Sequence, residues 1–314
     1  MITIGIHGGC GTLDRSLMSE AEWAESRDHM AAALRAGWKV LASGGPAVEA
    51  VEATIVVLED SPHFNAGYGA ALTADARHEL DASIMDGATL AAGAVAGTSR
   101  IRNPIKAARA VMEKSDCVLL IGPAADAFAE TKSLEMVDNT YFTTERRVEA
   151  LASLKRRAAS GTLKSASEAE KHGTVGAVAR DKAGNLAAGT STGGFNNKPV
   201  GRVGDSPIIG AGTYAKNGIC AVSCTGMGEV FIRRAAAYDV HARMAYAGNS
   251  LQEATAAVIE AVGSHGIGAG MVAIDANGQV LAPFNTLGMY RGWIAADSRV
   301  VAGTHEDVHD MGAA

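Results

Sequence analysis

The chain has 314 residues, of which 47% are hydrophobic and 20% are charged, with a formal net charge of −6. This much apolar sequence is enough to bury one large core or two modest ones. The chain carries no basic stripe and no run of about 18 apolar residues, so neither a nucleic-acid partner nor a membrane span is expected. Residues 1–7 read as a strand rather than as a signal peptide.

The cysteines and glycines indicate a compartment and a kind of site. Cys10, Cys117, Cys220 and Cys224 are scattered without a CxxC pair. This pattern predicts reduced, buried thiols in a cytoplasmic protein rather than a disulfide framework or a zinc site. Glycine is high, at 37 residues, and aromatic residues make up only 5%. Such a composition favours close backbone approach and main-chain contacts to a small ligand.

The first half of the chain reads as strands and helices in blocks. Ser19 and Glu22 fit a capping box at the start of a helix, and Asn103-Pro104 fits an N-cap followed by proline at the first helical position. Apolar runs predict strands at 2–6, 79–86, 90–96 and 117–121, and apolar periodicity predicts helices at 21–41, 47–58, from 104 onward and at 124–132.

The segment 145–173 has a different character, because apolar periodicity fades and Lys, Arg, Ser and Ala take over. We expect a solvated segment, part helix and part flexible linker. Beyond it the pattern predicts strands at 174–180, 186–190, 208–215, 219–224, 270–275, 280–283 and 289–294, and helices at 229–247 and 251–262. Blocks of strands and helices without steady alternation favour an α+β fold with antiparallel pairing.

The junction Gly173-Thr174 joins the polar segment to a strand-like run. If the chain is cut there, Thr174 carries a hydroxyl nucleophile and a free α-amine on one residue. An α-amine has an unperturbed pKa of about 7.7–8.0, so part of it is neutral at pH 7 and can act as a general base. Six other Gly-Thr pairs occur in the chain, but none joins a long polar segment to a buried-looking strand. An ordinary strand start is the alternative.

Two polar clusters after Thr174 could supply partners. A hairpin would bring Thr192, in the cluster 190–194, back beside Thr174, although a hydroxyl-rich turn is the alternative. Arg202 and Asp205 stand three residues apart between glycines. Arg binds carboxylates in a bidentate manner and Asp accepts from an ammonium group, so this pair fits a clamp for a free α-amino acid group. An exposed ion pair in a loop is the alternative.

A third cluster follows a predicted strand and opens a predicted helix. Thr225 and Gly226 stand at this point, where backbone N–H groups can face a developing negative charge. An ordinary capping turn is the alternative. The glycine-rich loop 7–11 fits neither GxGxxG nor GxxxxGK[ST], so nucleotide binding is not expected, and no serine sits on a GxSxG elbow.

Together these motifs resemble one known family. They are HGG at 7–9, FNAG at 64–67, ELDA at 79–82, HGTVG at 172–176, TSTGG at 190–194, GRVGDS at 201–206, TG at 225–226 and PFNT at 283–286. The chain resembles the plant-type L-asparaginases, also called isoaspartyl peptidases or β-aspartyl-peptidases, which are N-terminal nucleophile hydrolases. The resemblance covers residues 2 to about 302.

The resemblance implies an architecture. A single hydrolase domain, 1–314, would be made as a precursor that cleaves itself between Gly173 and Thr174. The products would be an α-subunit, 1–173, whose part from about 145 is the flexible linker, and a β-subunit, 174–314. The fold would be a four-layer αββα sandwich, and two precursors would form an (αβ)2 heterotetramer.

The resemblance also implies roles for several of the motif residues. The matching positions are Thr174 as nucleophile, Thr192 as the residue that orients it, Arg202 and Asp205 as binders of the substrate α-carboxylate and α-ammonium, Thr225 and Gly226 as the oxyanion hole, and Asn65 as a residue facing the nucleophile. No organic cofactor is implied. A structural sodium ion would be held by the main-chain carbonyls of Leu58, Glu59, Ser61, Phe64, Ala66 and Tyr68.

The implied reaction is hydrolysis of β-aspartyl dipeptides and of the L-asparagine side-chain amide through a β-aspartyl ester on Thr174, which releases aspartate. Glycosylasparaginases fit less well, because they usually carry Asp at the position of Gly173 and are usually exported. Threonine aspartases fit less well because their approach segment is longer. Cys10 and Met227 depart from the commoner family residues, and Met227 would narrow the leaving-group side. An unprocessed scaffold or small-ligand binder is the alternative from another class.

Overall fold

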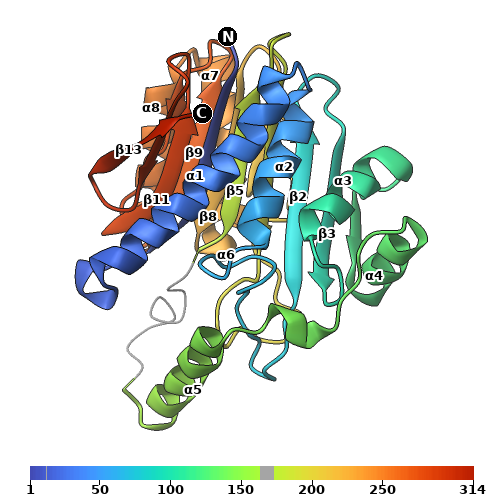
Figure 1. The fold of residues 1–314 in the computed structure, drawn as a ribbon, viewed down its shortest axis with the longest axis vertical. Coiled ribbons are helices and arrows are strands. Elements are labelled where there is room, and N and C mark those ends of the chain that lie inside the picture. The colour runs from blue at the N-terminus through green and yellow to red at the C-terminus, as the bar shows by residue number, and fades with distance from the viewer. Residues whose placement is uncertain (12, 163–172) are drawn as a thin grey trace.

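The computed structural model describes residues 1–11, 13–162 and 173–314 (Figure 1). Its strands are β1 (Thr3–Gly11), β2 (Leu80–Asp86), β3 (Ala92–Thr98), β4 (Leu119–Ile121), β5 (Val175–Arg180), β6 (Leu186–Thr192), β7 (Thr213–Lys216), β8 (Cys220–Gly226), β9 (Ala269–Asp275), β10 (Val280–Leu281), β11 (Gly288–Ile294), β12 (Arg299–Gly303) and β13 (Val308–Ala313). Its helices are α1 (Glu20–Ala42), α2 (Ala47–Glu59), α3 (Pro104–Lys114), α4 (Gly122–Thr131), α5 (Glu145–Ala159), α6 (Gly228–Arg234), α7 (Ala236–Ala247) and α8 (Leu251–Gly263), with short 3-10 turns at Arg15–Leu17 and Asn139–Phe142.

These strands form two sheets. The larger has nine strands in the order β13-β12-β11-β1-β5-β6-β2-β3-β4, and the smaller has four in the order β10-β9-β8-β7. Among the described strands only β3 and β4 pair in parallel, and every other pairing is antiparallel. The mixed content of helices and large antiparallel sheets agrees with the expected α+β class.

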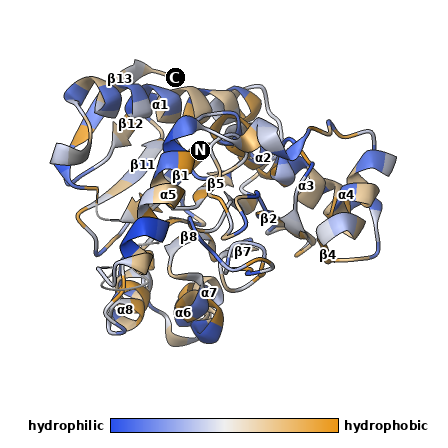
Figure 2. Ribbon diagram, turned by 90° about the horizontal axis from the view of Figure 1, so that it is seen from below, coloured by the Kyte–Doolittle hydropathy of each residue, from blue (hydrophilic) through white to orange (hydrophobic). Residues whose placement is uncertain are grey.

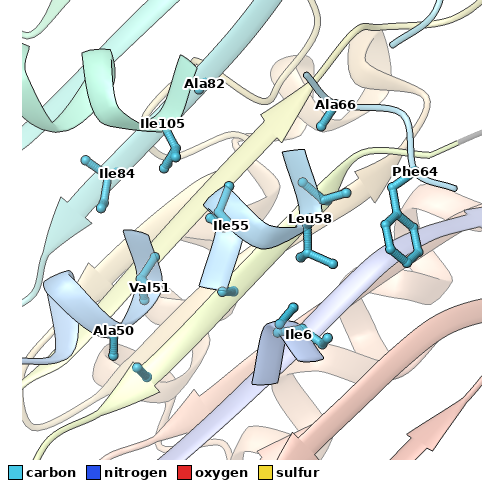
Figure 3. Packing of buried hydrophobic residues seen from close by; sticks show 14 of the residues in the cluster. Ile6, Ala50, Val51, Ile55, Leu58, Phe64, Ala66, Ala82, Ile84 and Ile105 are labelled. Carbon is cyan, nitrogen blue, oxygen red and sulfur yellow. The ribbon is translucent and has the colours of Figure 1, made fainter. Parts of the chain in front are cut away.

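Three apolar clusters show how the sheets and helices pack. One lies between the nine-stranded sheet and helices α1 to α4, and its members include Ile6, Ile55 and Ile105 (Figure 3). A second lies between the four-stranded sheet and α6 to α8. A third joins the two sheets through residues such as Val178 and Val272. Figure 2 accordingly shows α1 and α2 on one side of the strands and α6, α7 and α8 on the other.

The predicted capping box at the start of α1 is present. The Ser19 side chain accepts from the Glu22 N–H and the Glu22 side chain accepts from the Ser19 N–H. Asn103 takes the N-cap position of α3 but makes no capping hydrogen bond with its side chain. The carboxylate of Glu59 accepts from the Ile105 N–H instead, at 3.0 Å, because the end of α2 lies against the start of α3.

Several predicted elements have different bounds. The helix expected over 229–247 breaks at Ala235, whose φ of 46° lies in the left-handed region, so α6 and α7 are separate. The strand expected over 208–215 begins only at Thr213, because residues 205–212 turn back on themselves with hydrogen bonds such as Ile208 N to Asp205 O. Strands β12 and β13 were not predicted. Helix α5 occupies the first half of the segment 145–173, and residues 163–172 lie outside the described residues.

The cysteines are free, and Cys10, Cys220 and Cys224 are buried as expected. Cys117 is exposed, which corrects that expectation, because it precedes β4 at the edge of the larger sheet. Within the described parts of the chain, no helix combines the length and the apolar character needed to span a bilayer.

Polar side chains interrupt the apolar layer between the two sheets. His7 Nε2 lies 2.9 Å from Ser223 Oγ, Ser223 Oγ lies 2.7 Å from Thr190 Oγ1, and Thr213 Oγ1 lies within hydrogen-bond distance of both Thr190 Oγ1 and Ser83 Oγ. We call these five residues the inter-sheet hydroxyl network. All five are fully buried. Burial lowers the pKa of His7 to about 3, so its imidazole is neutral.

Gly176 on β5 shows how tightly the sheets approach at this network. A Cβ atom there would lie 1.9 Å from Ser223 Oγ and 2.5 Å from His7 Nε2. We expect Gly176→Ala to lower the free energy of unfolding by about 1–3 kcal/mol, because the sheets must separate. Urea unfolding at one protein concentration measures this. Gly11→Ala is the control, since no described atom lies within 4 Å of the added Cβ. Equal effects of both substitutions would contradict the close approach.

Candidate active site

Thr174 immediately precedes β5, and the β5–β6 hairpin determines its surroundings. The two strands pair antiparallel with Val175 opposite Ser191. This register brings Thr192 beside Thr174, whose hydroxyl donates to Thr192 Oγ1 at 3.2 Å. The Gly194 N–H donates to the same oxygen at 3.0 Å. Thr174 is only 8% exposed, so its hydroxyl lies in a sheltered position.

The hydroxyls of residues 190–192 are separated by strand alternation, because successive side chains of a strand point to opposite faces. Thr190 joins the inter-sheet hydroxyl network, and Thr192 meets Thr174. Ser191 points to the other face and donates to Glu59 Oε1 at 2.6 Å. Burial raises the pKa of Glu59 to about 8. Residues 190–192 of the cluster 190–194 therefore belong to the end of β6, and only Gly193 and Gly194 lie beyond the strand. Each of the three hydroxyl groups connects β6 to a different neighbouring segment.

Most of the predicted site residues meet at one cavity. Thr174, Thr192, Arg202, Asp205 and Gly226 line it together with Gly173. Its volume is about 30 Å³, which is room for little more than a water molecule. Asn65 and Thr225 do not line this cavity but lie beside it.

Arg202 is held in place by a partner that the sequence analysis did not find. Its Nε and Nη2 atoms donate to the two carboxylate oxygens of Glu229 on α6, each at 2.9 Å. Its guanidinium also stacks over the Phe195 ring, 4.7 Å from the centroid. The ion pair of Arg202 is therefore with Glu229 and not with Asp205. A spacing of 27 residues carries no local signal for such a pair.

Asp205 presents an unusual buried carboxyl group. Its residue is 3% exposed, and its Oδ2 atom has no hydrogen-bond partner among the described residues. Burial raises its pKa to about 7. The loop around it is fixed, because Ser83 Oγ donates to Ser206 O at 2.6 Å and Ile208 N donates to Asp205 O at 2.9 Å. A buried acceptor without a partner at a cavity wall suits a cationic ligand group.

Thr225 and Gly173 lie against each other. The Thr225 residue is fully buried, and its hydroxyl lacks a hydrogen-bond partner within the part of the chain that the structure describes. A Cβ atom at Gly173 would lie 2.8 Å from Thr225 Oγ1 and 2.3 Å from Gly9 Cα. Only glycine therefore fits at position 173 without displacing these neighbours.

Gly226 ends β8, and Met227 is the N-cap residue of α6 without a side-chain capping bond. The side chain of Met227 packs against the apolar cluster under α6 to α8 and is not among the residues that line the cavity. This placement does not test the prediction that Met227 narrows the leaving-group side, which stays a prediction.

Asn65 connects the loop after α2 to the turn after β6. Its Oδ1 accepts from the Ala71 N–H at 2.7 Å, and its Nδ2 donates to the Gly194 carbonyl. The Gly193 N–H donates in turn to the Asn65 carbonyl at 3.0 Å. Since Gly194 also bonds to Thr192, Asn65 braces the residue that contacts Thr174.

The loop 58–69 turns its apolar side chains into the core, as Figure 3 shows for Leu58, Phe64 and Ala66. The loop closes on itself, because the Tyr68 N–H donates to the Glu59 carbonyl at 2.7 Å. A Cβ atom at Gly69, whose φ is 98°, would lie 2.9 Å from Pro62 O and 3.0 Å from Phe64 O. Two main-chain oxygens thus lie near one point of the loop, one of them from the predicted ligand Phe64, and main-chain oxygens suit a hard cation.

Layered antiparallel sheets and a sheltered threonine at the head of a strand are typical of the N-terminal nucleophile hydrolases, a class of enzymes. The sequence model of the asparaginase family (Asparaginase_2) matches residues 1–303. The chain belongs to this family and is an enzyme of that class.

Similar proteins cover nearly the whole chain. An isoaspartyl peptidase of Escherichia coli (strain K12) is 48% identical over 311 residues, which is 98% of this chain and 97% of the relative. A plant-type L-asparaginase of Pyrococcus abyssi is 43% identical and covers 91% of this chain and 94% of its own length. An isoaspartyl peptidase/L-asparaginase of Mus musculus is 41% identical and covers 92% and 86%.

The raised pKa of Asp205 predicts how stability depends on pH. The folded protein keeps this proton up to about pH 7, whereas an unfolded Asp releases it near 3.8, so folding stability falls as pH rises between these values. Asp205→Asn has no such proton. We therefore compare the free energy of unfolding of Asp205→Asn with that of the wild type at each pH. The variant minus wild-type difference should be about 2–3 kcal/mol larger at pH 8 than at pH 5.

Urea unfolding at the two pH values measures this difference. Asp310→Asn is the control, because the Gly312 N–H lowers the pKa of Asp310, so this carboxyl is ionised in both states throughout the range. A difference between Asp205→Asn and the wild type that does not change with pH would show that Asp205 is already ionised at pH 5.

Proposed function

We propose that this enzyme is a self-processing amidohydrolase that cleaves β-aspartyl dipeptides and the side-chain amide of L-asparagine. The names of the relatives support this substrate class. The observation that carries the proposal is the meeting of a threonine hydroxyl, Thr174, with a basic and an acidic side chain, Arg202 and Asp205, at one cavity.

The first step proposed is hydrolysis of the bond between Gly173 and Thr174, giving fragments 1–173 and 174–314. The cleavage frees the α-amine of Thr174 to act as the general base for its own hydroxyl. The close packing of Gly173 against Thr225 and Gly9 supports a junction that is held in one defined position. Because Gly173 lines the small cavity, its departure would also enlarge the space for a substrate.

In the mature enzyme the substrate's α-carboxylate would bind Arg202, which Glu229 holds in place. Its α-ammonium group would bind the carboxylate of Asp205, whose Oδ2 atom has no partner within residues 1–11, 13–162 and 173–314. Asparagine and a β-aspartyl dipeptide then present the same aspartyl group with its side-chain carbonyl toward Thr174. The two substrates differ only in the leaving group.

Attack of the Thr174 hydroxyl on the side-chain carbonyl breaks the amide bond and leaves a β-aspartyl ester on Thr174. Thr192 orients the attacking hydroxyl. Thr225 and Gly226 would stabilise the oxyanion, a contribution worth a few kcal/mol of barrier. Ammonia or an amino acid leaves with the transferred proton, and water then hydrolyses the ester to aspartate and free Thr174.

The proposal extends to architecture, ions and location. We infer that the two packed sheets with their outer helices form the four-layer αββα sandwich of the class, and that two processed precursors assemble as (αβ)2.

A sodium ion bound by the carbonyls of the loop 58–68 would hold that loop, including Asn65, in its closed form. Four free thiols support a cytoplasmic location. No organic cofactor enters the chemistry.

Denaturing mass spectrometry tests the processing step. We expect purified wild-type protein to separate into fragments 1–173 and 174–314, and Thr174→Ala to remain one chain, because alanine lacks the attacking oxygen. Thr174→Ser is the matched control, since it keeps a hydroxyl and should still be cleaved. A catalytically active preparation in which residues 173 and 174 are still joined would overturn the mechanism.

Substrates that differ in one group test the clamp. A β-aspartyl dipeptide carries the α-carboxylate, whereas a β-alanyl dipeptide of the same leaving group lacks it. We expect Arg202→Ala to lower kcat/KM for the β-aspartyl dipeptide about 10²-fold, because a charge-assisted bidentate contact is lost. Activity toward the β-alanyl dipeptide should change much less.

Arg243→Ala serves as the control for this experiment, since Arg243 pairs with Asp239 on α7, outside the cavity. If Arg202→Ala reduced kcat/KM for both dipeptides by the same factor, Arg202 would not be the group that binds the substrate α-carboxylate. Parallel assays with L-asparagine show whether the leaving group affects the rate. No turnover of any aspartyl substrate by processed wild-type protein would discard the substrate assignment.

A further inference from the structure

A cluster of two histidines and one glutamate lies where helix α1 meets the loop after α2. Glu25 and His29 are four residues apart on α1, so they share one face of the helix. His63 comes from the loop. One ligand atom of each residue lies within 4.8 Å of the other two. The sequence analysis gave no role to any of the three.

The spacing of these atoms suits a metal ion. His63 Nε2 lies 3.5 Å from Glu25 Oε1, and the ring centroids of His29 and His63 are 4.6 Å apart. In a tetrahedral zinc site with bonds of about 2.0–2.1 Å, neighbouring ligand atoms are roughly 3.3 Å apart. One pair therefore already has nearly this spacing. The His29 ligand atom must move about 1–1.5 Å closer to the other two ligand atoms. Rotation of the exposed Glu25 side chain or of the half-buried His29 side chain would achieve this.

His63 is the fixed member of the cluster. Its side chain is 14% exposed, whereas that of Glu25 is 59% exposed. The His63 N–H donates to Ser61 Oγ at 3.3 Å, and the next residue, Phe64, is buried in the core. His63, in a defined position on the loop, thus faces Glu25 and His29 on the long helix α1. Because the Glu25 side of the cluster is exposed to solvent, water could be a further ligand.

We propose that Glu25, His29 and His63 bind Zn²⁺ and that the bound ion ties the loop after α2 to helix α1. Two imidazole nitrogens and one carboxylate oxygen suit Zn²⁺, whereas Mg²⁺ and Ca²⁺ prefer oxygen ligands alone. The ligands are side chains, so this site is distinct from the main-chain carbonyls that would hold sodium.

The site lies next to the machinery of the cavity. His63 and Asn65 are two residues apart, and both line a hollow that also contains Gly173. Asn65 in turn donates to the Gly194 carbonyl, beside Thr192. An ion that holds His63 against α1 therefore restrains the loop that braces Thr192.

Two further charges face the cluster. Arg146 of α5 lines the same hollow as His63, and its positive charge opposes a bound cation. Glu22, on α1, is a further carboxylate whose charge interacts with those of Arg146 and His63, and it acts in the opposite sense. These charges predict that removing Arg146 tightens zinc binding.

Calorimetric titration of the full-length, chelator-treated protein with ZnCl2 at constant sodium concentration tests the site. We expect one Zn²⁺ per chain. His29→Ala, His63→Ala and Glu25→Gln should each weaken binding 10-fold or more, and Arg146→Ala should strengthen it. His309→Ala is the matched control, because His309 has a carboxylate 3.4 Å away, on Asp307, but belongs to no three-residue cluster of this kind in the described chain.

Two further readouts need no substrate, so they are independent of the proposed catalysis. ZnCl2 should raise the Tm of the wild type and of His309→Ala but not that of His63→Ala. Co²⁺ as a probe should give a visible absorption band that the three ligand variants lose. Absence of a one-to-one zinc complex in the wild type, or equal affinities of all variants, would show that Glu25 and His63 make only a side-chain contact.

Discussion

The pairing of β5 with β6 in the middle of the larger sheet is the constraint on which the rest of the site depends. The register that sets Val175 opposite Ser191 is the reason why the hydroxyls of Thr174 and Thr192 meet. Neighbouring strands β1 and β2 flank this hairpin on both sides, so neither of its strands is an edge strand. Thr174, which immediately precedes β5, is therefore held in a fixed register. A shift of β5 by one residue would move all of its side chains to the opposite face of the sheet.

From this hairpin, polar contacts reach each loop of the site. Thr190 connects through Thr213 and Ser83 to the loop that carries Asp205. Ser191 reaches Glu59 at the end of α2, where the loop containing Asn65 begins. These groups are buried, and leaving any one of them unpaired would cost about 1–3 kcal/mol, so they specify one arrangement of the loops.

The electrostatics of the cavity follow from which charges are paired and which are not. Arg202 has its carboxylate partner in Glu229, so its guanidinium keeps a fixed orientation. The Oδ2 atom of Asp205 has no such partner in the described part of the chain, and burial raises the pKa of this carboxyl group to about 7. A ligand with an ammonium group would supply the missing charge, whereas an apolar ligand would leave this acceptor unsatisfied.

The amino-acid sequence by itself determined the local elements and the candidate chemistry. Apolar periodicity and the Ser19 capping box predicted the main helices and strands, and motif order indicated Thr174, Arg202 and Asp205 as candidate site residues. These features depend on residues close together in the chain, where steric and hydrogen-bonding preferences act directly.

Only the tertiary structure decided which distant groups meet. The partnership of Arg202 with Glu229, the capping of α3 by Glu59 and the approach of His63 to Glu25 join residues with no local relation in sequence. The break between helices α6 and α7 falls at Ala235, where the sequence has no glycine or proline that would predict it. Such features follow from how whole sheets and helices pack, because long-range contacts form only when the entire core closes.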